Sequence, residues 1–113
     1  MGIEARAVIK YVHISPRKVR RVADMVRGQG VNEALTYLKF LPQAAAKPVA
    51  KAIKSAAANA EDIHGLSADE LYIARITADD GPRLKRWRAG PRGRAKPILK
   101  RSAHITVVVS EWE

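Results

Sequence analysis

Residues 81–104 carry charge of a single sign, and this stretch constrains the fold of this chain more than any other feature. It holds nine lysines and arginines and no aspartate or glutamate. The whole chain of 113 residues has 21 basic and 11 acidic residues and a formal net charge of +10, so the remainder is almost neutral. The rest of the chain has the composition of an ordinary folded body, and the charge of this segment favours a polyanion as partner.

The length and composition are those of one small globular protein. A hydrophobic content of 47% is ordinary for a folded chain, and 113 residues can bury a modest core. The absence of cysteine excludes disulfides, thiolate catalysis and cysteine-ligated metal centres. No apolar run is long enough to span a bilayer, and the N-terminus lacks the layout of a secretion signal. We expect residues 1–113 to form a single domain of a soluble, cytoplasmic protein with no membrane partner.

Three strands are predicted in the body, two from hydrophobic residues that alternate with a period of two and one from a β-branched run. Residues 3–14 form the first, and its buried face is expected to carry Ile3, Ala5, Ala7, Ile9 and Tyr11. In the second, residues 70–78, the alternation places Leu71 and Ile73 on one face and Tyr72, Ala74, Ile76 and Ala78 on the other. The third is the β-branched run at 105–110.

Helical spacing predicts three helices between the first two strands, at about 16–27, 31–40 and 43–63. Ser15 is the expected N-cap of the first helix, with Pro16 as its first residue. Pro48 predicts a kink or an irregular first turn in the third helix. The element order predicts an α+β fold, in which a small antiparallel three-stranded sheet packs on three helices.

The segment between the last two strands is too long for an ordinary turn in so small a protein. We expect the two strands to continue past the body as a long, protruding basic β-hairpin at about 80–104, with its tip at residues 88–93. Arms of about ten residues would project about 30 Å. A two-stranded ribbon without a core is marginal in water, so a binding partner is expected to hold it.

Two groups of side chains are candidates for RNA contact. The first is in the hairpin: Arg83, Lys85, Arg86, Trp87, Arg88, Arg92, Arg94, Lys96, Lys100 and Arg101. Trp87 lies between two arginines, so it is suited to stack on a base while they bind phosphates, although a tryptophan can equally anchor a hairpin to its own domain.

The second group lies at the start of the first helix: Arg17, Lys18, Arg20 and Arg21. Cations there oppose the positive end of the helix dipole, and a phosphate would relieve that repulsion. The alternative is a capped helix with a solvated basic face.

Catalytic, metal and cofactor sites are not expected. His13, His64 and His104 are far apart in sequence and have no metal-binding spacing. The carboxylates occur as adjacent pairs, which point to opposite faces of a strand and are poor acid/base partners. Neither a glycine-rich phosphate loop nor a nucleophile motif is present, so we do not expect an enzyme.

Several ordered blocks of sequence resemble the bacterial-type large-subunit ribosomal protein L-twenty-two family. The blocks are residues 14–20 (ISPRKVR), 56–61 (AAANAE), 81–86 (GPRLKR), 92–95 (RGRA) and 104–109 (HITVVV). The resemblance runs from Ile3 to Val109. It departs at the hairpin tip, where Gly90 replaces an arginine that is common in the family.

The resemblance implies a structural constituent of the large ribosomal subunit. Its partners would be large-subunit ribosomal RNA, neighbouring ribosomal proteins and the nascent peptide, because the family's hairpin lines the exit tunnel. The hairpin arginines and lysines and the residues of the first helix would then be RNA contacts. The alternative hypothesis is a free basic DNA- or RNA-binding protein outside the ribosome. The sequence shows no helix with base-reading side chains arranged for duplex DNA, which favours the first hypothesis.

Overall fold

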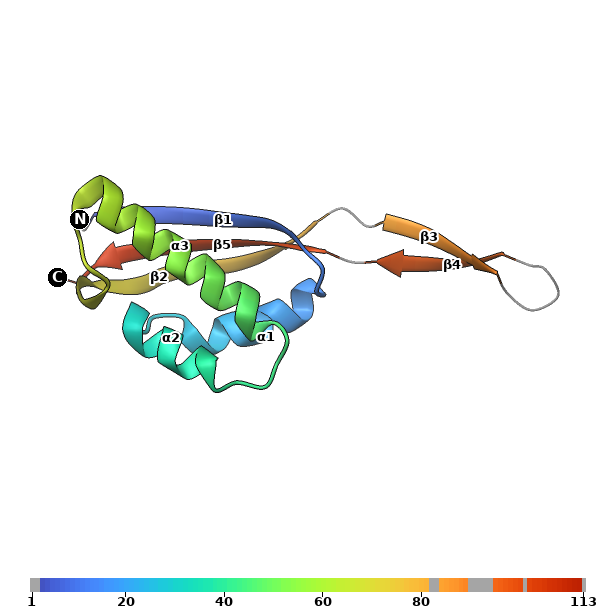
Figure 1. The fold of residues 1–113 in the computed structure, drawn as a ribbon, viewed down its shortest axis with the longest axis horizontal. Coiled ribbons are helices and arrows are strands. Elements are labelled where there is room, and N and C mark those ends of the chain that lie inside the picture. The colour runs from blue at the N-terminus through green and yellow to red at the C-terminus, as the bar shows by residue number, and fades with distance from the viewer. Residues whose placement is uncertain (1–2, 82–83, 90–94, 101, 113) are drawn as a thin grey trace.

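A computed structural model of the protein describes residues 3–81, 84–89, 95–100 and 102–112, and for 84–89 and 95–100 it describes the backbone. The elements in chain order are β1 (Glu4–Val12), α1 (Pro16–Val26), α2 (Val31–Lys39), α3 (Ala46–His64), the 3-10 turn η1 (Ala68–Glu70), β2 (Leu71–Asp80), β3 (Leu84–Ala89), β4 (Ala95–Lys100) and β5 (Ala103–Glu111). The antiparallel sheet has the order β1-β5-β2, and β3 and β4 form a second sheet (Figure 1). The predicted α+β fold is confirmed.

The core lies between the three-stranded sheet and the helices. α3 covers β1 and β5, while α1 covers β2 (Figure 1). The inward face of α3 is built largely from small side chains, all of them buried: Val49, Ala52, Ile53, Ala56 and Ala60. Because alanine adds little bulk, the helix axis can lie close to the sheet. The buried side of α1 carries Val19, Val22, Ala23 and Val26, which recur at helical spacing.

A bulge near the end of β1 changes which residues face the core. Pairing with β5 is regular from Glu4 opposite Ser110 to Ile9 opposite Ile105, and then the register shifts before Val12 pairs with Ala103. Ala5 and Ala7 are buried as predicted, but Tyr11 is 58% exposed. The prediction that Tyr11 faces the core was wrong, because the extra residue in the bulge breaks the period of two. The prediction for Ile3 was wrong as well, since it is 42% exposed at the end of the sheet.

A second bulge corrects the predicted faces of β2. Its register against β5 shifts between Ile73 and Arg75. As a result Leu71 and Ile73 are buried together with Ile76 and Ala78, rather than on opposite faces. The predicted strict alternation placed Leu71 and Ile73 on one face and Ile76 and Ala78 on the other, and that part of the prediction was wrong.

The helix ends differ in detail from the sequence prediction. α3 begins at Ala46 rather than near 43, so Pro48 lies in its first turn, where a missing N–H breaks no helical hydrogen bond. Gly65 ends this helix in the left-handed conformation, with φ of 68°. Ser15 occupies the N-cap of α1, but its side chain makes no capping hydrogen bond.

The basic segment forms the predicted hairpin as far as it is described. β3 and β4 pair antiparallel from Leu84 opposite Lys100 to Ala89 opposite Ala95. The hairpin leaves the body where Asp80 pairs with Ala103 and the Gly81 N–H donates to the Ser102 carbonyl oxygen at 3.0 Å. With it the molecule measures 63 × 26 × 19 Å (Figure 1). Most of the predicted tip, residues 90–93, lies outside the described residues.

Candidate nucleic-acid interface

The start of α1 presents cations at the hairpin end of the body. Arg17, Lys18 and Arg21 are exposed, and the first turn contains no acidic residue. The Ser15 carbonyl accepts the N–H groups of Lys18 and Val19 at 3.0 and 3.2 Å. The positive end of the helix dipole therefore coincides with the cationic side chains of Arg17 and Lys18, and Arg21 follows in the second turn, an arrangement that favours an anion.

Arg20 differs from its basic neighbours because it also supports the fold. Its Nε donates to the Ala78 carbonyl oxygen at 2.9 Å, and Arg27 donates through Nη2 to the Ile76 carbonyl oxygen at 2.9 Å. β2 is an edge strand of the sheet, so these carbonyls face away from β5. The two arginines, one on α1 and one at its C-cap, thus tie α1 to the free edge of β2. Neither arginine was predicted from the sequence to make this contact.

Replacing Arg20 by lysine is expected to lower stability while keeping the charge. An ammonium group cannot reproduce the side-on Nε–H donor that meets the Ala78 oxygen. A loss of about 1 kcal/mol is expected, or roughly 4–8 °C in the unfolding midpoint. The measurement is thermal unfolding followed by circular dichroism, with Arg21→Lys as the control because Arg21 is exposed. Equal midpoints for the two variants would show that the Arg20 contact contributes nothing.

A small hollow of about 170 Å³ joins the α1 surface to the root of the hairpin. Its lining combines the start of α1 with both strands of the root: Ser15, Pro16, Arg17, Arg20, Asp80, Gly81 and Ser102. The start of α1 is therefore adjacent in space to the root of the hairpin, although Arg20 and Asp80 are 60 positions apart in the chain (80 minus 20). One extended polyanion is able to contact both.

The hairpin candidates are described only in part. Lys85, Arg86, Trp87 and Arg88 belong to β3, and Lys96 and Lys100 to β4, so their backbones are placed while their side chains lie outside the described residues. Arg83, Arg92, Arg94 and Arg101 lie outside the described residues altogether.

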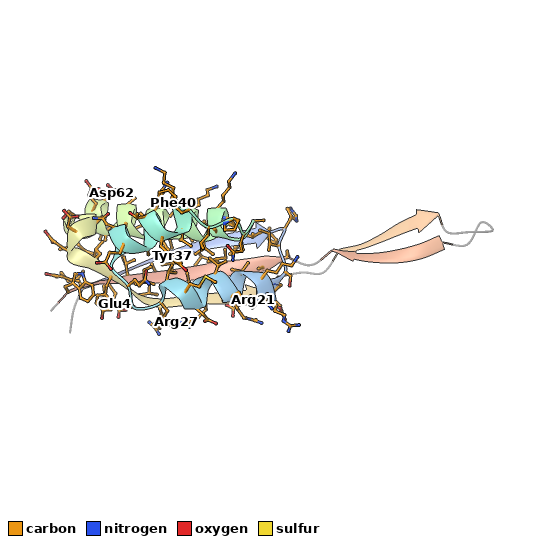
Figure 2. All side chains as sticks on the ribbon, turned by 90° about the horizontal axis from the view of Figure 1, so that it is seen from below. Glu4, Arg21, Arg27, Tyr37, Phe40 and Asp62 are labelled. Atoms are coloured by element: carbon orange, nitrogen blue, oxygen red, sulfur yellow. The ribbon has the colours of Figure 1, made fainter. Side chains whose placement is uncertain are left out.

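Charge is distributed unevenly along the molecule. The end opposite the hairpin is where β1 and β2 begin and β5 ends, as Glu4 pairs with Ser110 and Leu71 with Glu111. Figure 2 shows Glu4 and Asp62 toward that end and Arg21 toward the hairpin. Carboxylates at this end come from several elements: Glu4 begins β1, Asp69 and Glu70 immediately precede β2, Glu111 ends β5, and Asp62 belongs to the last turns of α3. Asp79 and Asp80 lie instead at the hairpin root. A polyanion is thus attracted to one end and repelled by the other.

Comparison with known proteins identifies the family. Residues 7–110 match the family described as ribosomal protein L22p/L17e. The chain belongs to this family. It is 53% identical to the large ribosomal subunit protein uL22 of Thermoanaerobacter sp. (strain X514) over 98% of this chain and 100% of that protein. The uL22 proteins of Clostridioides difficile and Halothermothrix orenii are 51% and 49% identical, each over 96% of this chain and over 98% and 96% of their own lengths.

The structure also reveals a cationic surface that the sequence analysis missed in this L22p/L17e family member. Lys47, Lys51 and Lys54 are exposed on α3 at intervals of four and three residues, which places them on one side of the helix. That spacing is visible in the sequence, although the three lysines were not among the predicted RNA contacts.

No group of three or more histidine or acidic side chains among the described residues is placed to hold a metal ion. Within the same residues, no helix is long and apolar enough to cross a membrane.

Proposed function

We propose that the protein binds large-subunit ribosomal RNA through two adjoining surfaces, the start of α1 and the basic hairpin, and that the hairpin lines the nascent-peptide exit tunnel. Membership of the ribosomal protein L22p/L17e family supports a structural, non-enzymatic role in the large ribosomal subunit. The observation that carries the RNA-binding proposal is the position of Arg17 and Arg20 around a hollow at the hairpin root. Residues 1–113 would act as one domain with an extended binding arm.

The α1 surface is preformed and needs little ordering to bind phosphates. Its backbone is helical, and the Arg20 side chain is already held by the Ala78 carbonyl. Binding there sacrifices little conformational entropy. The hairpin has a different character, because its two strands pair with each other and belong to a sheet separate from that of the body. Threaded into folded RNA, such a ribbon would exchange water for phosphate contacts on both sides.

The charge separation indicates how the body is oriented. With the hairpin end toward RNA, the carboxylates around Glu4, Asp62 and Glu111 point away from it. That end is then available to solvent or to the basic side chains of neighbouring ribosomal proteins. A hairpin that reaches inward from the α1 surface would meet the nascent peptide in the tunnel, and the nascent peptide is therefore a further proposed partner.

Affinity for ribosomal RNA is expected to depend steeply on salt. If about six of the hairpin cations meet phosphates, log K should fall with log[salt] at a slope of roughly −4 to −5. Between 50 and 200 mM salt the affinity for a protein-free large-subunit RNA fragment should fall on the order of a thousandfold. Filter binding across a salt series measures the slope. A slope near −1 would indicate that apolar or base contacts dominate, and the proposed phosphate contacts would be wrong.

A free nucleic-acid-binding protein outside the ribosome is the competing function. The proposed and the competing function are distinguished by sedimentation of a cell extract through a gradient at high salt. A constituent of the large subunit stays with that particle, whereas a free RNA- or DNA-binding protein is released as its phosphate contacts weaken. Recovery of the protein near the top of the gradient would contradict the proposed function.

A further inference from the structure

Tyr11 stands out among the described residues because its backbone is strained and its side chain is exposed. It is the one described residue other than glycine with a positive φ, at 60°. A bulky side chain disfavours this left-handed conformation, and glycine would adopt it without penalty. The strain sits in the β1 bulge, between Ile9 and Val12. Strained positions of this kind persist where the surrounding structure enforces them, and they cluster at binding sites.

Two contacts with His104 hold Tyr11 in place. The Tyr11 backbone N–H donates to His104 Nδ1 at 3.1 Å, and the two rings meet edge to face at a centroid distance of 5.0 Å and an angle of 88°. The hydrogen bond uses the backbone and would form with any residue but proline. The tyrosine ring is therefore not needed to make it, and at 58% exposure the residue contributes little to the core.

The ring lies at the hairpin end of the body, beside both proposed RNA-binding surfaces. His104 belongs to β5 and pairs with Asp79 of β2, one step from the pair at the hairpin root. On the other side β1 leads within a few residues to Ser15 and the start of α1. Lys10 and His13, which flank Tyr11, are exposed. An RNA strand that contacts both α1 and the hairpin passes close to this ring.

We propose that Tyr11 is a stacking platform for an unpaired RNA base, presented by the strained bulge and positioned by His104. The inference rests on the proposed RNA-binding function and adds a contact of a different chemical kind. Aromatic rings bind bases that are splayed out of RNA helices, and the contact does not depend on charge. Lys10 would hold the phosphates on either side of that base. His104 acts through the Tyr11 backbone and is a positioning residue.

The test compares four full-length proteins for binding to protein-free large-subunit ribosomal RNA: wild type, Tyr11→Gly, Tyr11→Phe and Tyr37→Ala. Tyr11→Gly removes the ring and fits the positive φ, so the fold should be retained. Its affinity should fall about tenfold or more, the loss expected for one stacked base. The slope of log K against log[salt] should not change, because stacking releases no counterions. Tyr11→Phe should bind like wild type.

Tyr37→Ala is the matched control, since it removes an exposed tyrosine of α2 that is 45% accessible. It should leave the affinity unchanged. The stacking proposal is overturned if Tyr11→Gly binds as tightly as Tyr11→Phe, if its salt slope becomes shallower by about one unit, or if Tyr37→Ala loses as much. Failure of the wild-type protein to bind the RNA would instead overturn the proposed function itself, so the two failures are distinguishable.

Discussion

Replacing Arg17, Lys18 and Arg21 together by glutamate should exclude the protein from large ribosomal subunits. All three side chains are exposed at the start of α1, so the fold should survive the change. Each replacement removes a cation and adds an anion at the positive end of a helix, where phosphates are proposed to dock. Loss of three phosphate contacts alone should weaken RNA binding by about 10²- to 10³-fold near 0.1 M salt, and the new repulsion adds to this. Arg20 is kept because its contact with Ala78 belongs to the fold.

Deleting the hairpin should be less harmful than reversing the α1 charges. Removal of residues 85–97 with closure by a short turn takes away most of the basic segment. Fixing the hairpin in one position within folded RNA costs conformational entropy, however, and this offsets part of its electrostatic attraction. The shortened protein is therefore expected to fold and to enter large subunits. Gradient sedimentation followed by mass spectrometry of the assembled subunits compares both variants with wild type.

The chain offers a control with the same change in charge at another surface. Lys47, Lys51 and Lys54 are exposed on α3, and their replacement by glutamate also lowers the formal net charge from +10 to +4, two units for each of three residues. If incorporation depends on the α1 surface, this variant should be affected far less than the α1 variant. Equal exclusion of both would show that total charge matters rather than position. If the α1 variant is incorporated normally while the hairpin-deletion variant is excluded from large subunits, the hairpin is the anchor.

The body of the fold was predictable because its hydrophobic pattern is regular over most of each element. α1 shows this, as the spacing of Val19, Val22 and Val26 alone identifies its buried side. The errors arise at the two β-bulges. One extra residue in a bulge interrupts the alternation, so the residues that follow it point to the opposite face of the sheet from the one predicted. Tyr11 and Ile76 were assigned to the wrong faces for this reason. A bulge depends on pairing with β5, about 30 to 100 residues away, and no local pattern encodes it.

The candidate nucleic-acid interface was also predictable from the sequence only in part. The positions of lysine and arginine along the sequence were sufficient to locate the basic hairpin and the cations of α1, because charge is a property of the residues themselves. The position of the start of α1 beside the hairpin root, at one hollow, is a property of the topology, since β5 returns beside both β1 and β2. The double role of Arg20 could not be inferred either, because its partner is a backbone carbonyl, which every residue carries. The unusual backbone conformation of Tyr11 likewise could not be predicted from its residue type.

Replacing Gly81 by alanine should misdirect the hairpin and prevent incorporation into large subunits. A Cβ at this position would collide with the side-chain oxygen of Ser102 and lie 3.3 Å from both the Ser102 carbonyl carbon and His104 Cε1. The Gly81 N–H is also bonded to the Ser102 carbonyl oxygen, so the two strands of the root cannot separate without losing that bond. The strain should lower stability by about 1–3 kcal/mol and tilt the hairpin. A tilt of about 10° moves the end of an arm about 30 Å long by about 5 Å, which is enough to miss a channel through folded RNA.

Two further variants separate misdirection from simple instability. Gly65→Ala carries the same substitution at the acidic end, where nothing lies within 4 Å of the new Cβ but the φ of 68° imposes strain. It should lose about 1 kcal/mol and still be incorporated. Combining Gly81→Ala with deletion of residues 85–97 removes the long arm that the tilt would displace, so incorporation should return. If the combined variant remains excluded while the deletion alone is incorporated, the defect lies in the docking of the body at the hairpin root. The direction of the hairpin would then not be what Gly81 controls.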